Sequence, residues 1–122
     1  MPRAAATGRV DDHLPLKPLV FQVLMALADG ERHGWALVRD AQQHGGFERI
    51  MPGNFYRTLR TMLGDGLIED AGRRARAGPD DERRRYFRLT TFGAEVAAAE
   101  ARRLEAVVME ARSKRFLARP RS

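Results

Sequence analysis

The sequence predicts a mainly α-helical domain with a small β-hairpin, and three observations support this fold class. Apolar residues recur at helical spacing in three segments before residue 65. Two short stretches that suit strands follow, separated by Arg, Gly, Pro and Asp residues. A long segment from about residue 92 to 116 then returns to helical spacing. Because the chain has 122 residues, we expect one compact core.

Two helices are predicted in the first third of the chain. The first has the i, i+3, i+4, i+7, i+8 apolar pattern, with Pro18 in its first turn, Gly30 at its end and apolar residues at Leu16, Leu19, Val20, Val23, Leu24 and Leu27. The second stops at Gly45-Gly46, and its apolar members are Trp35, Leu37, Val38 and Ala41. A lone aromatic residue on a helix is more often in the core, so we expect Trp35 there; an effector pocket is the alternative.

The third predicted helix opens at Pro52 and has two chemically different sides. Phe55, Leu59, Met62 and Leu63 form its apolar side, and Gly64 and Gly66 weaken the helix after them. A helical wheel places Asn54, Arg57 and Thr61 opposite Leu59, with Thr58 and Arg60 at the flanks. This outward side is therefore available to a partner.

A β-hairpin and a long final helix complete the predicted elements. Leu67-Ile68 and the stretch from Arg84 to Thr90 are expected to pair as strands, with Phe87 and Leu89 facing the core. Arg84, Tyr86 and Arg88 then lie on the other side of the hairpin. Thr90 or Thr91 suits the N-cap of a helix from about Phe92 to Phe116.

Three helices, a two-stranded hairpin and a long helix are the element order of a winged helix-turn-helix domain with a C-terminal dimerisation helix. We expect a flexible N-terminal arm at residues 1–13, the winged domain at 14–90, the dimerisation helix at 91–117 and a tail at 118–122. The long helix carries an apolar stripe that we expect to form the dimer interface through Leu104, Val107, Val108 and Ala111. Packing of this stripe against the first helix is the alternative.

Three stretches in the same order resemble PadR-type transcriptional regulators. GNFYRTLRTMLGDGLI from Gly53 to Ile68 resembles the recognition-helix signature of that family. LADGERHGWAL from Leu27 to Leu37 resembles the turn into its second helix, and RRYFRLTTFG from Arg84 to Gly93 resembles its wing strand and the start of its last helix. The sequence departs from the family pattern at Asn54-Phe55, at Trp35 and at Gly64.

The resemblance implies a sequence-specific double-stranded DNA-binding protein, a homodimeric repressor that binds an inverted-repeat operator. It also implies a small apolar or aromatic effector, although no residue here identifies one. The alternative is a non-enzymatic winged-helix module for a protein or RNA partner, which the acidic residues Asp80, Asp81 and Glu82 at the wing tip favour.

The charge of the chain points to a polyanionic partner. Twenty-two basic residues against sixteen acidic ones give a net charge of +6, and only Lys17 and Lys114 among the basic residues are Lys. Arg suits phosphate oxygens and guanine edges, although a GC-rich coding sequence produces the same bias.

The expected DNA contacts divide between the third helix and the wing. We expect Arg57 to contact a base edge or nearby phosphate, and Tyr56 and Arg60 to contact the sugar-phosphate backbone, with Thr58 and Thr61 beside them. Asn54 suits adenine or the N-cap of the helix. In the wing, the arginines on the two limbs suit a narrow minor groove; they are Arg73, Arg74, Arg76, Arg83 and Arg84, followed by Arg85.

Enzymatic and metal-binding functions find little support in the composition. Cysteine is absent, Ser occurs only near the C-terminal end, and the three His residues form no ligand pair, so we expect no catalytic triad, metal or cofactor. The longest apolar stretch, Leu19 to Ala28, is too short to cross a bilayer. We therefore expect a cytoplasmic protein that is not an enzyme.

Overall fold

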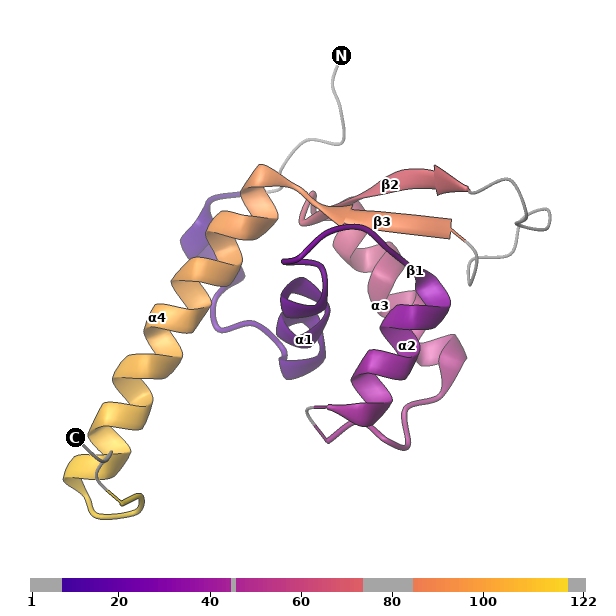
Figure 1. Ribbon diagram of the computed structural model, residues 1–122. Coiled ribbons are helices and arrows are strands. Elements are labelled where there is room, and N and C mark those ends of the chain that lie inside the picture. Colours follow the sequence, from indigo (N-terminus) through magenta and orange to yellow (C-terminus); the bar gives the residue numbers. More distant parts are fainter. Residues whose placement is uncertain (1–7, 45, 74–84, 119–122) are drawn as a thin grey trace.

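The computed structural model describes residues 8–44, 46–73 and 85–118. It is mainly helical with one small antiparallel sheet, as predicted (Figure 1). The elements in chain order are the 3-10 helix η1 (Val10–His13), α1 (Pro18–Ala26), β1 (Arg32–His33), α2 (Gly34–Gln43), α3 (Pro52–Gly64), β2 (Ile68–Arg73), β3 (Arg85–Leu89) and α4 (Thr91–Ser113).

The helices α1, α2 and α3 surround the core and cover one side of the sheet (Figure 1). Leu24, Val38 and Phe55 are completely buried, one from each of these helices. Ile68 and Phe87 add the apolar side of β2 and β3, and Leu89 packs against them. The predicted parity of β3 is therefore confirmed, because Arg88 is exposed between two core residues.

The sheet has three strands rather than the two that were predicted. Its order is β1-β3-β2, so β3 lies in the centre, with Arg32 opposite Phe87 and Ile68 opposite Leu89. A strand of two residues has no recognisable alternation, which explains why the sequence did not indicate β1. It exists because the free edge of β3 offers it backbone partners.

A bulge interrupts β2 between Asp70 and Gly72. Gly72 has φ +93°, a conformation that favours glycine, and its N–H donates to Asp70 Oδ1 at 2.7 Å. The hairpin therefore bends at a position where the sequence supplies a glycine.

The start of α4 is joined tightly to the end of α3. Thr90 is the N-cap of α4, as predicted, and its hydroxyl accepts from the Gly93 N–H at 2.8 Å and donates to the Gly66 carbonyl at 2.6 Å. A Cβ at Gly93 would overlap the carbonyl oxygen of Leu67, so only glycine fits there. This junction sets the direction in which α4 leaves the domain.

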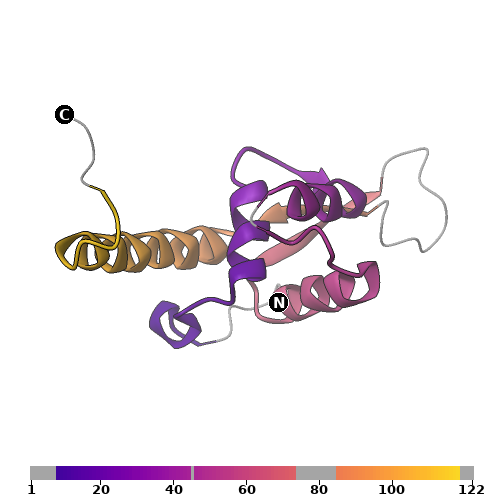
Figure 2. The same ribbon diagram turned by 90° about the horizontal axis from the view of Figure 1, so that it is seen from below.

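The long helix α4 leaves the domain with its first turns packed and its last turns projecting. Figures 1 and 2 both show its C-terminal half extending past α1 away from the sheet. The first turns contact α1 and η1, and the His13 and Phe92 rings meet edge to face at 5.3 Å. Residues 10–13 of the expected flexible arm are thus part of the fold, because η1 has α4 to pack against.

Two details of α1 and α2 differ from expectation. Helix α1 ends at Ala26, before the predicted stop at Gly30, and Trp35 on α2 is 40% exposed rather than part of the core. Leu37 and Val38 fill the core instead. The predicted stop of α2 falls partly on residue 45, which lies outside the described residues; the helix ends at Gln43 with His44 as C-cap.

Candidate nucleic-acid interface

The helix α3 has a rigid apolar side and a polar side that faces outward. Phe55, Leu59 and Met62 are buried and fix the orientation of the helix. Asn54, Arg57, Arg60 and Thr61 are exposed, as the helical wheel predicted, and Thr58 is half-buried at the flank. The segment Pro52–Gly64 contains two arginines and no acidic residue. This polar side is therefore cationic and accessible along its length.

Tyr56 lies on the core side of α3. Its exposed fraction is 8%, and its ring packs edge to face against Phe55 at 5.9 Å. The burial argues against the expected contact with the sugar-phosphate backbone. The helical wheel already contained this signal, because Tyr56 lies about 60° from Leu59 and far from Asn54.

The N-terminus of α3 has no side-chain cap. Met51 is the N-cap and its side chain makes no capping hydrogen bond, which corrects the expectation that Asn54 caps the helix. Asn54 is the third helical residue and exposed, so its amide remains on the outward side.

The N–H groups of the first turn have no acceptor within the helix. Apart from its chain neighbours and the backbone of its own helix, no described atom lies within 4 Å of a Cβ built on Gly53. This end of α3 therefore offers backbone N–H donors and the positive end of the helix dipole to an approaching anion.

Two arginines of β3 form ion pairs with acidic residues. Arg85 Nη1 lies 2.8 Å from Asp70 Oδ2, and Arg88 Nε lies 2.7 Å from Glu69 Oε2. The Arg88 Nη1 also reaches Glu31 Oε2 at 3.5 Å, so this side chain links the turn before β1 to β2. The hydrogen bond that Arg88 donates to Glu69 is the main cause that raises the pKa of Arg88.

These acidic partners are residues that sequence reasoning missed. Glu69 and Arg88 are direct partners in the register that Ile68 and Leu89 establish, so the apolar pattern contained the signal for this pair. The sequence pattern did not indicate Glu31, because its proximity to Arg88 depends on the pairing of β1 with β3.

Most of the predicted wing residues lie outside the part of the chain that the structure describes. Arg74, Arg76, Arg83 and Arg84 lie outside the described residues, and Arg73 is the last residue of β2, opposite Arg85. Their contacts with DNA stay predictions.

The projecting half of α4 exposes apolar side chains. Val107 and Val108 are 49% and 37% exposed, whereas Leu104 and Ala111 on the same stripe are half-buried. Closer to the domain, this side of the helix carries Glu100, which is buried and accepts from Arg103 Nε at 2.7 Å and Nη2 at 2.9 Å. The hydrogen bond from Arg103 is the main cause that lowers the pKa of this carboxyl, and a bond with the Leu16 backbone contributes.

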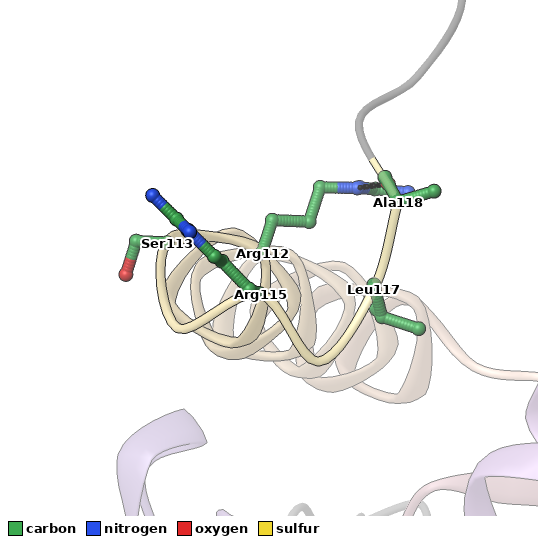
Figure 3. A pocket seen from close by; sticks show the side chains of 5 residues that line it. All are labelled: Arg112, Ser113, Arg115, Leu117 and Ala118. Carbon is green, nitrogen blue, oxygen red and sulfur yellow. Dashed lines mark hydrogen bonds between the residues drawn. The ribbon is translucent and has the colours of Figure 1, made fainter.

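A hollow at the end of α4 does not resemble an apolar effector pocket. Arg112, Ser113, Arg115, Leu117 and Ala118 line it where the chain reverses after the helix (Figure 3). The reversal is made by Arg115 at φ 67°, and Arg112 Nε donates to the Ala118 carbonyl at 3.0 Å. The effector stays a prediction.

Two further features bear on the class of site. In the described ranges, no group of three His, Asp or Glu side chains is placed to hold a metal ion. The helices of these ranges include none with the length and hydropathy needed to cross a membrane.

Known proteins resemble this chain in sequence and in fold. The model of the family described as "Transcriptional regulator PadR-like family" matches residues 23–99. The transcriptional regulator Rv3488 of Mycobacterium tuberculosis is 33% identical over 88 residues, which cover 72% of this chain and 77% of that protein.

Solved structures agree with this arrangement of elements. A PadR-like transcriptional regulator from Bacillus cereus has a TM-score of 0.65 at 24% identity, covering 78% of this chain and 88% of that one. A PadR family transcription regulator from Clostridium difficile R20291 has a TM-score of 0.68 at 15% identity, covering 80% and 97%. At these identities the structures establish the winged helix fold alone.

Proposed function

This chain belongs to the PadR-like family of transcriptional regulators, and we propose that it binds double-stranded DNA as a homodimer at an inverted-repeat operator and represses transcription there. Membership in this family makes it a regulator and not an enzyme.

The observation that carries the proposal is the outward side of α3. A helix that enters the major groove needs an apolar back that holds it rigidly and a polar front that reaches base edges. Phe55 and Leu59 supply the back, and Asn54 and Arg57 supply the front. Arg57 suits guanine and Asn54 suits adenine, whereas Arg60 at the flank suits phosphate.

The dimer follows from the exposed stripe on α4. An apolar helix side that projects beyond its own domain favours a second apolar surface, and a second copy supplies the same stripe. Two-fold symmetry then presents two α3 helices to half-sites about one DNA turn apart, roughly 34–36 Å. The operator is accordingly expected to be an inverted repeat. A small apolar or aromatic effector that shifts this dimer stays a prediction from the family resemblance.

Selection of bound duplexes from a random library tests the proposal. We expect an inverted repeat to emerge, and its affinity to fall steeply between two salt concentrations because phosphate contacts release counterions. The selected duplex should bind far more tightly than scrambled DNA and than RNA of the same sequence. Equal affinity for scrambled DNA, or preference for the RNA, would contradict it.

A further inference from the structure

The two threonines on the outward side of α3 both turn their hydroxyl groups back to the helix. Thr58 Oγ1 donates to the Asn54 carbonyl at 3.2 Å, and Thr61 Oγ1 donates to the Arg57 carbonyl at 3.2 Å. A threonine hydroxyl has one proton, and each of these protons is used within the helix. What Thr61 still offers to an outside partner is its methyl group and the lone pairs of its oxygen.

Thr61 lies on the surface that we propose to face DNA, one helical turn past Arg57. At about 100° per residue it lies roughly 20° from Asn54 and 40° from Arg57 around the helix axis. Thr61 is exposed, whereas Thr58 is half-buried at the flank. Thr61 therefore presents an apolar methyl group on this surface, next to Arg57.

In the major groove, thymine is the base that presents a methyl group, and a threonine methyl is an apolar partner for it. We infer that Thr61 recognises a thymine in each operator half-site through contact between its methyl group and the thymine 5-methyl group. This inference rests on the proposed function of α3 as the DNA-reading helix. Donation of the Thr61 hydroxyl to a base would first have to break its bond to the Arg57 carbonyl.

The experiment removes the methyl group from the base and, on the protein, separates the methyl group of Thr61 from its hydroxyl. The full-length protein is titrated with its selected operator and with duplexes in which symmetric thymines are replaced, one pair at a time, by deoxyuridine, which lacks the methyl group. At one pair of positions we expect affinity to fall about fourfold per half-site, the effect of one methyl removed from an apolar contact. Thr61→Val keeps the methyl, so it should retain this discrimination. Thr61→Ser keeps only the hydroxyl, so it should bind both duplexes equally.

The outcomes distinguish this inference from the function on which it rests. If Thr61→Ser still discriminates between thymine and deoxyuridine, a group other than the Thr61 methyl contacts the thymine methyl and the inference is wrong. An operator whose affinity is unchanged by every deoxyuridine substitution also overturns it, while the proposed function stands. If the selection yields no preferred duplex, the proposed function fails and the inference fails with it. Melting temperatures of both variants near that of the unsubstituted protein confirm that they are folded.

Discussion

Arg57 is the side chain whose role is most directly measurable. It is exposed on the outward side of α3, and a guanidinium there can pair with both acceptors of a guanine edge. Arg57→Ala should lower specific affinity by about 1–3 kcal/mol and relax the preference at one base pair of each half-site. Titration of the operator and of its single-base variants measures both effects.

Arg60→Ala is the matched control, because Arg60 lies at the flank where phosphate contacts are expected. It should weaken all duplexes by a similar factor. A uniform loss for Arg57→Ala as well would reassign Arg57 to the phosphate backbone.

Gly53 tests how closely the N-terminus of α3 approaches its partner. No described atom fills the space of its missing side chain, and glycine weakens a helix by about 0.5–1 kcal/mol relative to alanine. Gly53→Ala should therefore raise the free energy of unfolding yet lower operator affinity, because the added methyl lies where DNA approaches. Denaturant unfolding and operator titration measure the two opposite effects.

Gly64→Ala provides the comparison at the opposite end of the same helix, where a Cβ also meets open space. It should gain stability without losing affinity. Equal affinity for the two variants would place the N-terminus of α3 away from the DNA.

Glu100 gives the fold a pH-dependent contribution whose sign is determined by its partner. The hydrogen bond from Arg103 holds the pKa of the Glu100 carboxyl in the folded protein below the ordinary value of 4.5. The contribution of Glu100 to the free energy of unfolding is therefore complete above pH 4.5 and is lost as the pH falls through the folded pKa. Glu100→Gln should cost about 1–2 kcal/mol at pH 7. The difference from the unsubstituted protein should shrink below pH 4.5. Unfolding at equal protein concentration and several pH values measures this difference.

Glu95→Gln, exposed on the same helix, is the control and should change stability little at any of these pH values. If the Glu100→Gln difference were the same at low and neutral pH, packing rather than ionisation would explain it.

At the scale of elements, the acidic residues of the hairpin pair with its arginines and so reduce the attraction of these arginines for phosphate. The Glu69 carboxylate lies 2.7 Å from the exposed Arg88 side chain, so a phosphate must compete with this carboxylate for the guanidinium. Glu69→Gln should raise affinity for random duplex DNA several-fold at low salt. The slope of log affinity against log salt concentration, the salt slope, should steepen by about one if Arg88 then neutralises a phosphate.

Glu110→Gln removes the same charge from the projecting half of α4 and controls for net charge. Indistinguishable salt slopes for the two variants would show that Arg88 does not reach DNA.

At the scale of the whole molecule, the dimer should depend on the stripe of α4. Val108→Glu places a charge within it and should yield a monomer in sedimentation experiments. Operator affinity should fall roughly tenfold or more, because the two half-sites no longer bind as one unit.

Ala106→Glu introduces the same charge on the opposite side of the same turn and should leave the assembly and the affinity unchanged. A dimer that persists in Val108→Glu at micromolar concentration would move the interface elsewhere.

Local rules were sufficient for a large part of this molecule. The helical segments, the outward side of α3, the parity of β3 and the Thr90 cap all followed from spacing and capping chemistry, which depend on residues a few positions apart. The three stretches that resemble the family added the order of these elements. For these features the sequence by itself was decisive, because helical spacing, strand alternation and capping are set by residues within one turn or one strand.

Tertiary structure decided the features that depend on which elements become neighbours. The strand β1 exists because β3 has a second edge, and Arg88 meets Glu31 because β1 lies there. Glu100 is buried because the chain at Leu16 crosses α4, and η1 is ordered for a similar reason. No periodicity encodes these contacts, since they join residues far apart in the chain and form only when the core brings their elements together.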